Sequence, residues 1–114
     1  MTFEGVRPVL HLPFADTPEQ PILEDELAGL AERMLDLGVD GLAVPQLASE
    51  AWTLTDAERE RVIAIAAEVC AERAPLIVGL DGTTAVAVHR ARQAAAAGAA
   101  GLMVLPPRQA TDPD

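Results

Sequence analysis

A polar loop, Gln46-Leu-Ala-Ser-Glu50, follows a short apolar run and is the stretch best placed to carry chemistry. The run, Gly41 to Val44, is too short for a helix and has the length of a buried strand. Pro45 closes that strand, because proline cannot donate to a strand ladder. In α/β proteins, ligands gather in the loops at the carboxyl ends of the strands. We therefore expect the functional site at that edge of the sheet.

The residue types that the chain lacks restrict its chemistry further. None of the 114 residues is a lysine, a tyrosine or an asparagine. A Schiff base with a carbonyl substrate requires an amine, and the terminal amino group is the only one present. A tyrosine proton relay is excluded in the same way. The chain also contains no Gly-x-Gly-x-x-Gly and no Walker loop, so we expect no nucleotide and no other cofactor.

Three side chains that bind metals in other proteins are present, but their spacing does not favour a site. His11, His89 and Cys70 do not have the separations of metal ligands, and we expect no metal. His11 lies in an apolar run and is interpreted as a hydrogen-bonded core histidine; the alternative is a ligand or an acid/base group. Cys70 falls on the apolar stripe of a helix, which indicates a buried small hydrophobe rather than a nucleophile.

Composition narrows the classes of partner. The formal charge of −10 argues against nucleic acid and against an anionic membrane surface. No apolar run approaches the roughly 20 residues that cross a bilayer, and the N-terminus lacks the pattern of a signal peptide. A single cysteine fits a reducing compartment, so we expect a cytoplasmic protein.

Periodicity predicts alternating strands and helices. An acid-rich helix start, a capping box at Thr55 and Glu58, and glycines at 38 and 98 mark the helix ends. The expected strands are Val6–Phe14, Gly41–Val44, Leu76–Val78 and Gly101–Leu105. The expected helices run from about Ile22 to Leu37, from the cap at Thr55 to about Arg73, and from a cap at Thr83 or Thr84 to about Ala97.

The phrase Gly38-Val-Asp-Gly-Leu-Ala-Val-Pro45 returns as Gly98-Ala-Ala-Gly-Leu-Met-Val-Leu-Pro106. Such a repeat indicates copies of one βα unit. Short strands that alternate with helices predict a parallel sheet with right-handed crossovers. The order βαβαβαβ is half of an eight-fold (β/α)8 TIM barrel. A small open parallel sheet of the flavodoxin type is the competing architecture.

The sequence resembles the N-terminal half of the dihydrodipicolinate synthase and N-acetylneuraminate lyase family, class I aldolases on a TIM barrel. The motifs that carry the resemblance are Gly5-Val6 with Pro13-Phe14, Gly38–Val44 with Glu50, Thr53–Thr55 with Glu58-Arg59, Thr84-Ala85 with Ala97-Gly98, and Leu102–Pro107. The resemblance covers residues 1–109 as a partial barrel domain and leaves 110–114 as an acidic tail. It implies a lyase that acts on 2-oxo acids such as pyruvate.

The chain departs from the family at the positions that would contact substrate. Where relatives read Gly-Thr-Thr-Gly-Glu, this chain reads Gln46-Leu-Ala-Ser-Glu50, and Arg108 follows the fourth strand in place of tyrosine. By resemblance, Ser49, Glu50 and Arg108 are the candidates for contact with an anionic substrate. The alternative for Glu50 is a structural carboxylate that bonds loop amides, and the alternative for Arg108 is a solvated residue of the tail. The Schiff-base lysine of the family lies on a later strand, so we expect no catalytic residue within this chain.

Half a barrel has two open edge strands, and open edges recruit further strands. We therefore expect self-association or a complementary chain. Two functional interpretations follow from the resemblance. One is a fragment or half-barrel of a lyase, inactive alone. The other is a non-catalytic half-barrel module that completes a barrel with a partner chain or binds a small carboxylate.

Overall fold

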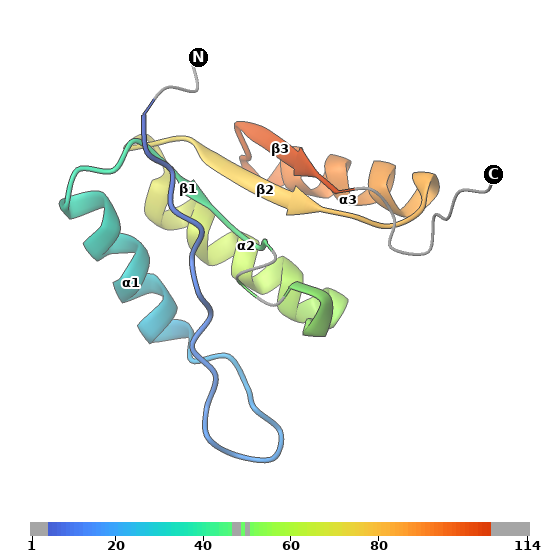
Figure 1. The fold of residues 1–114 in the computed structure, drawn as a ribbon, viewed down its shortest axis with the longest axis horizontal. Helices are drawn as coiled ribbons and strands as arrows, with labels where there is room; N and C mark the ends of the chain where they lie inside the picture. The colour runs from blue at the N-terminus through green and yellow to red at the C-terminus, as the bar shows by residue number, and fades with distance from the viewer. Residues whose placement is uncertain (1–4, 47–48, 50, 106–114) are drawn as a thin grey trace.

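The computed structural model of the chain describes residues 5–46, 49 and 51–105. Its elements alternate along the chain as expected, with a short 3-10 turn before the second helix (Figure 1). In order they are α1 (Glu24–Asp36), β1 (Leu42–Ala43), η2 (Ala51–Thr53), α2 (Asp56–Cys70), β2 (Leu76–Leu80), α3 (Thr84–Ala97) and β3 (Gly101–Val104). The predicted α/β class and the parallel βα repeat are confirmed.

The three strands form one parallel sheet in the order β1-β2-β3. Ala43 is paired with Ile77, and Ile77 with Gly101, so these three positions share one face of the sheet. Sequential strands are neighbours, as they are in a barrel. Their carboxyl ends therefore meet at a single edge.

The first expected strand, Val6 to Phe14, runs alongside β1 without forming a continuous ladder (Figure 1). Val9 makes an isolated parallel bridge with Ala43, supported by a 3.0 Å hydrogen bond from Leu10 N to Ala43 O. Pro8 and Pro13 supply no backbone N–H, which interrupts the donors that a regular strand needs. The sheet thus has three strands and one bridged segment, where the sequence predicted four strands.

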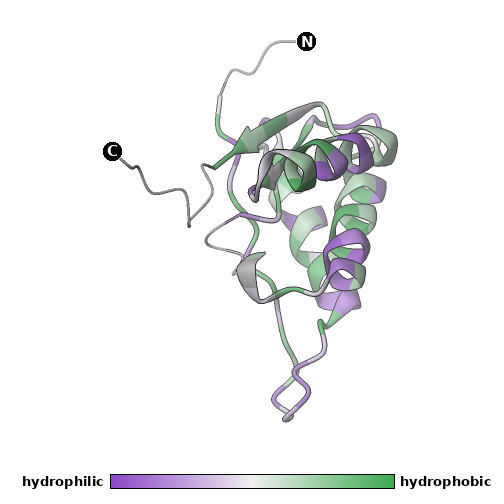
Figure 2. Cartoon of the chain, turned by 90° about the vertical axis from the view of Figure 1, so that its right-hand side faces the viewer, coloured by the Kyte–Doolittle hydropathy of each residue, from purple (hydrophilic) through white to green (hydrophobic). Residues whose placement is uncertain are grey.

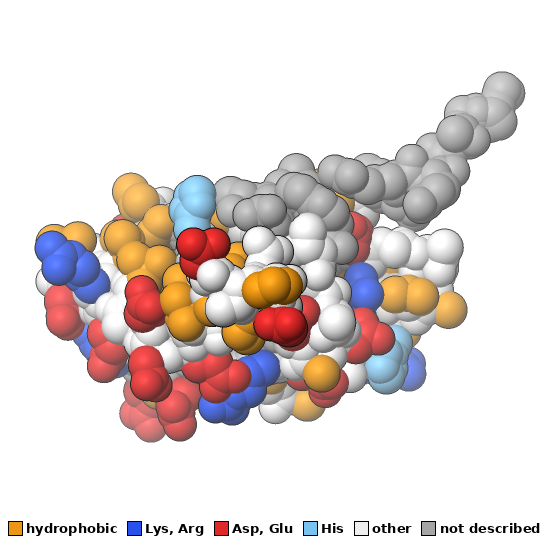
Figure 3. Space-filling model, turned by 90° about the horizontal axis from the view of Figure 1, so that it is seen from below, with side chains coloured by type: hydrophobic (Ala, Val, Ile, Leu, Met, Phe, Trp, Pro, Cys, Tyr) orange, Lys and Arg blue, Asp and Glu red, His pale blue; other side chains and the backbone are white. Residues whose placement is uncertain are grey.

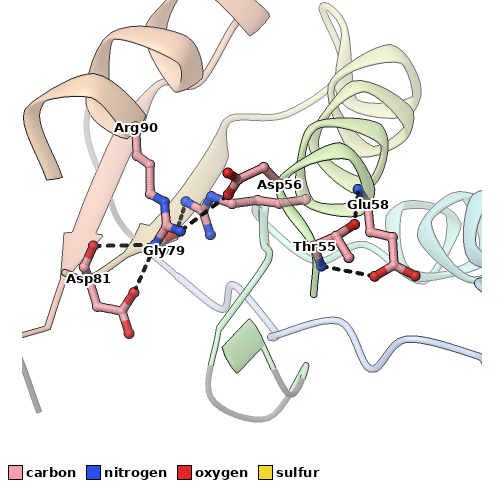
Figure 4. A network of polar contacts seen from close by, with 7 residues as sticks. Thr55, Asp56, Glu58, Gly79, Asp81 and Arg90 are labelled. Carbon is pink, nitrogen blue, oxygen red and sulfur yellow. Dashed lines mark hydrogen bonds and ion pairs between the residues drawn. The ribbon is translucent and has the colours of Figure 1, made fainter. Parts of the chain in front are cut away.

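Local sequence signals account for the helix ends. The Thr55 hydroxyl accepts a 3.1 Å hydrogen bond from the Glu58 amide, and the Glu58 carboxylate accepts one of 2.9 Å from the Thr55 amide (Figure 4). The predicted capping box is therefore confirmed. Gly38 and Gly98 adopt φ values of 95° and 107°. These left-handed conformations favour glycine and end the helices that precede them.

All three helices lie on one side of the sheet (Figure 2). Between the two layers, alternate strand residues such as Leu42, Val44 and Val78 pack against Leu27 of α1 and Val62 of α2. Each of these five side chains is fully buried. Cys70 is 2% exposed in the same cluster, so its expected role as a buried hydrophobe is confirmed.

The sheet ends in an uncovered strand. Leu102, Met103 and Val104 of β3 are 43%, 46% and 60% exposed, whereas Leu42 and Val78 on the inner strands are completely buried. In a complete barrel a further strand and helix would cover these side chains. The open edge expected for half a barrel is therefore present at β3.

Candidate functional site

The carboxyl ends of β1 and β2 lie side by side. The Val44 amide donates a 3.0 Å hydrogen bond to the Ile77 carbonyl, which ties the last residues of β1 to β2. From there the chain passes through Pro45 into Gln46, and β2 continues past Gly79 to Leu80. This is the edge at which the sequence predicted a site.

Gln46 is a buried polar residue at this edge. It is 6% exposed, and its backbone carbonyl accepts hydrogen bonds from the Ser49 amide at 3.0 Å and the Ala51 amide at 3.2 Å. Its side-chain nitrogen Nε2 is buried and has no hydrogen-bond partner among the described residues. Buried donors without partners are rare, so a specific explanation is required for this one.

Gly79 leaves the space in which the Gln46 amide lies. A Cβ atom added to Gly79 would be 2.2 Å from the Pro45 carbonyl oxygen and 2.7 Å from both Cδ and Nε2 of Gln46. Real side chains do not approach so closely. Only glycine at this position lets the amide pack directly against β2.

Arg59 fixes the opposite side of Gly79. Its guanidinium, 6% exposed, donates a 2.6 Å hydrogen bond to the Gly79 carbonyl. Desolvation lowers the pKa of Arg59, the nearby charge of Arg90 lowers it further, and Asp81 and Asp56 oppose both effects. The guanidinium remains a cation at neutral pH, because arginine is not deprotonated in proteins.

Arg90 links the end of β2 to the start of α2. It donates to the Asp81 carboxylate at 3.2 Å and to the Asp56 carboxylate at 3.4 Å (Figure 4). This contact brings α3, the loop after β2 and the first turn of α2 together at one end of the sheet. The two carboxylates offset the charge of Arg90 and hold its guanidinium between these elements.

The structure describes one of the three predicted substrate-contact residues. Ser49 is 1% exposed, and its hydroxyl donates a hydrogen bond to the Leu10 carbonyl in the segment beside β1. Its lone pairs remain available as acceptors. Glu50 and Arg108 lie outside the described residues. The substrate contacts of all three residues remain predictions.

The interpretation of His11 as a core histidine is wrong. Its neighbours Leu10 and Leu12 are buried, but His11 is exposed. Alternation explains the difference, because successive side chains of an extended segment point to opposite faces. Leu10 and Leu12 face the helices, and His11 faces away from them.

No group of three metal-binding side chains was found in the ranges that the structure describes. The same ranges include no helix that combines the length and the apolar character of a membrane span. On the face shown in Figure 3, acidic side chains are spread widely and arginines stand singly. That face presents no basic patch.

Chemically, the described side chains at this edge are suited to binding. The Gln46 amide can donate to an oxygen atom of a ligand, the Ser49 hydroxyl can accept from a ligand donor while its proton is bonded to the Leu10 carbonyl, and the Arg59 guanidinium holds β2 in place. Neither of the two side chains at the edge is an amine that could attack a carbonyl. The fold is that of part of a TIM barrel, and these side chains lie at the carboxyl ends of its first strands, the end at which such barrels carry their active sites.

The comparisons with known proteins identify which barrel family this is. Residues 2–109 match the Dihydrodipicolinate synthetase family. The chain belongs to this family.

Relatives with assigned names agree with this assignment. The chain is 36% identical over 98 residues to a 4-hydroxy-tetrahydrodipicolinate synthase from Mycolicibacterium gilvum, which covers 84% of this chain and 32% of the relative. It is 36% identical over 104 residues to an L-2-keto-3-deoxyarabonate dehydratase from Azospirillum brasilense, covering 90% of this chain and 33% of the relative. The chain thus spans about a third of the length of these curated relatives.

A solved structure shows the same fold. The crystal structure of dihydrodipicolinate synthase from Aquifex aeolicus superimposes with a TM-score of 0.84 at 34% identity. The match covers 91% of this chain and 35% of that one. The predicted half-barrel of this family is therefore confirmed, and the flavodoxin-like alternative is not supported.

Sequence reasoning missed the contribution of two residues. Arg59 lies in a helix in which most of the other charged residues are exposed, so the sequence did not distinguish it from a surface arginine. Gly79 bounded an apolar run and indicated only the end of a strand. The signal available in retrospect is glycine inside a strand, which often marks a close approach of another chain segment.

Proposed function

We propose that this chain is the N-terminal part of a lyase barrel that acts on a 2-oxo acid such as pyruvate. In the proposal, the chain supplies the first substrate-binding loops, and the lysine that forms the Schiff base comes from polypeptide outside these 114 residues. The observation that carries the proposal is the combination of a family match over residues 2–109 with a sequence that contains no lysine.

Within the proposal, Ser49, Glu50 and Arg108 are the substrate-binding residues, and Arg108 supplies the positive charge that attracts the substrate carboxylate. Backbone amides of the loop after β1 add donors of the kind that bind anions in other proteins. A single buried Cys70 agrees with a reducing cytoplasm, where we infer that the barrel works.

The experiment is complementation. The chain is co-expressed with the part of the Mycolicibacterium gilvum relative that follows the matched region, and the purified mixture is treated with pyruvate and borohydride. Borohydride reduces an imine to a stable secondary amine, which mass spectrometry detects. We expect an adduct on the supplied portion only when this chain is present. A control with the supplied portion alone shows whether that portion reacts without the chain.

A second candidate is a non-catalytic module that completes a barrel with a partner chain. The uncovered strand β3 favours it, because three consecutive apolar side chains there are between 43% and 60% exposed. Co-purification from the native host distinguishes the two functions. A partner that carries the reactive lysine supports the lyase, and a partner without one supports the module.

A further inference from the structure

The buried amide of Gln46 has no role in the fold that the described contacts explain. The residue is 6% exposed, and its Nε2 atom is buried without a hydrogen-bond partner in the described ranges. Folding removes the hydrogen bonds that this donor makes with water, and no hydrogen bond within the described residues replaces them. Water, an ion or a functional role accounts for such groups in other proteins, and the place of this one at the carboxyl end of the sheet favours a ligand as its partner.

The position of Gly79 shows which way the amide faces. Leu76 and Val78 point into the core between sheet and helices, so Ile77 and Gly79 must point to the opposite face. The Gln46 amide lies where the side chain of Gly79 would begin, 2.7 Å from an ideal Cβ. It therefore lies on the sheet face away from the helices, which is the interior of a barrel.

The backbone that carries the amide is held in place before any ligand arrives. The backbone carbonyl of Gln46 accepts hydrogen bonds from the backbone amides of Ser49 and Ala51. The hydrogen bond from Arg59 holds the Gly79 carbonyl on the other side. A donor on so constrained a backbone loses little conformational freedom on binding, which favours affinity.

We propose that Gln46 is a specificity-determining residue whose Nε2 donates a hydrogen bond to a carboxylate oxygen of the 2-oxo acid. The inference rests on the proposed function, and it names the Gln46 side-chain amide as the group that recognises the substrate carboxylate. A primary amide donates to carboxylate oxygens without carrying charge. It thus recognises the acid in a chain whose net charge of −10 otherwise repels anions.

The chain offers a direct spectroscopic test. It contains four glutamines, Gln20, Gln46, Gln93 and Gln109, and no asparagine, so a ¹H–¹⁵N spectrum shows four side-chain amide pairs. The variant Gln46→Met is similar in volume and identifies the Gln46 pair by its disappearance. Gln93→Met on α3 is the matched control.

Titration with pyruvate is expected to shift the Gln46 pair in a saturable way and to leave the Gln20 and Gln93 pairs in place. The backbone amide of Gly79 reports binding in both variants. We expect Gln46→Met to weaken binding about tenfold or more, the typical effect of losing one hydrogen bond to a charged group, and Gln93→Met to leave it unchanged. No shift at Gln46, or equal shifts at Gln20 and Gln93, would overturn the proposal.

The outcome is separable from that of the proposed function, because the titration requires no lysine. If the complemented barrel traps pyruvate but the Gln46 pair does not respond, only the role of Gln46 fails. If the pair responds but no imine is trapped, only the lyase reaction fails.

Discussion

The guanidinium of Arg59 donates a 2.6 Å hydrogen bond to the carbonyl oxygen of Gly79, joining the first turn of α2 to the carboxyl end of β2. Gly79 is thus fixed from one side by Arg59 and touched from the other by the Gln46 amide. Gly79 therefore contacts both the helix layer, through Arg59, and the barrel interior, through Gln46.

Replacement of Arg59 by methionine should destabilise the fold. The Gly79 carbonyl would lose its donor while remaining buried, which typically costs about 1–3 kcal/mol in the free energy of unfolding. Urea denaturation measures the change. Arg61→Met on the same helix is the control, because Arg61 forms an exposed ion pair with Glu24 at 2.9 Å. Exposed pairs contribute about 0–1 kcal/mol, and equal losses in the two variants would contradict the role given to Arg59.

Glycine substitutions should have opposite effects at two positions. Gly79→Ala places a methyl group 2.2 Å from the Pro45 carbonyl oxygen, and overpacking of this kind costs about 1–3 kcal/mol. Gly29→Ala lies in helix α1 with nothing within 4 Å of the added Cβ, so it should stabilise the chain by about 1 kcal/mol. Thermal unfolding of both variants tests the pair. A neutral Gly79→Ala would show that the Gln46 amide is not constrained as described.

The stability of the chain should fall in mildly alkaline solution. Desolvation raises the pKa of the Cys70 thiol, and the charge of Arg73 opposes this only in part. The folded thiol therefore keeps its proton above about pH 8.5, where an unfolded thiol loses it. Unfolding releases that proton, so stability decreases with rising pH by at most about 1.4 kcal/mol per pH unit.

Urea midpoints between pH 8 and 10 measure this dependence. The chain has no lysine and no tyrosine, so apart from the terminal amino group Cys70 is the side chain that titrates in this window. Cys70→Ala should be less stable at neutral pH, because it leaves a cavity, but should lack the alkaline slope. The same slope in both proteins would assign the effect to another group.

The open edge at β3 should drive self-association of the isolated chain. Val104 is 60% exposed at this edge, and a lysine there would discourage the pairing of further strands. Light scattering after size exclusion should show that Val104→Lys shifts the chain toward monomer. Val86→Lys is the control, because Val86 lies on α3 away from this edge and is 41% exposed. This variant should leave the oligomeric state unchanged. A wild-type chain that remains monomeric at high concentration would contradict the expectation.

Much of the fold could be predicted from the sequence because its signals are local. The capping residues Thr55 and Glu58, the left-handed Gly98 and the apolar run at Leu76–Val78 each depend on near neighbours. The first segment could not be predicted fully, since its pairing depends on which backbone donors Pro8 and Pro13 remove. The exposure of His11 depends on which face of the sheet the helices cover.

The site was predicted less completely, because its parts come from distant positions. The loop after β1 followed from strand order alone. The contact between Gln46 and Gly79 joins residues of different strands, and the bond from Arg59 to Gly79 joins a helix to a strand. Neither spacing along the sequence nor residue type indicates such contacts.

Peptide-level mass spectrometry after borohydride trapping tests the central claim most directly, namely that this chain builds part of a lyase barrel whose reactive amine lies elsewhere. With pyruvate, the chain alone should carry no stoichiometric adduct on any internal residue. With the complementary barrel portion, the adduct should appear on a lysine of that portion and depend on this chain. A stoichiometric internal adduct on this chain, or trapping that is independent of its presence, would contradict the claim.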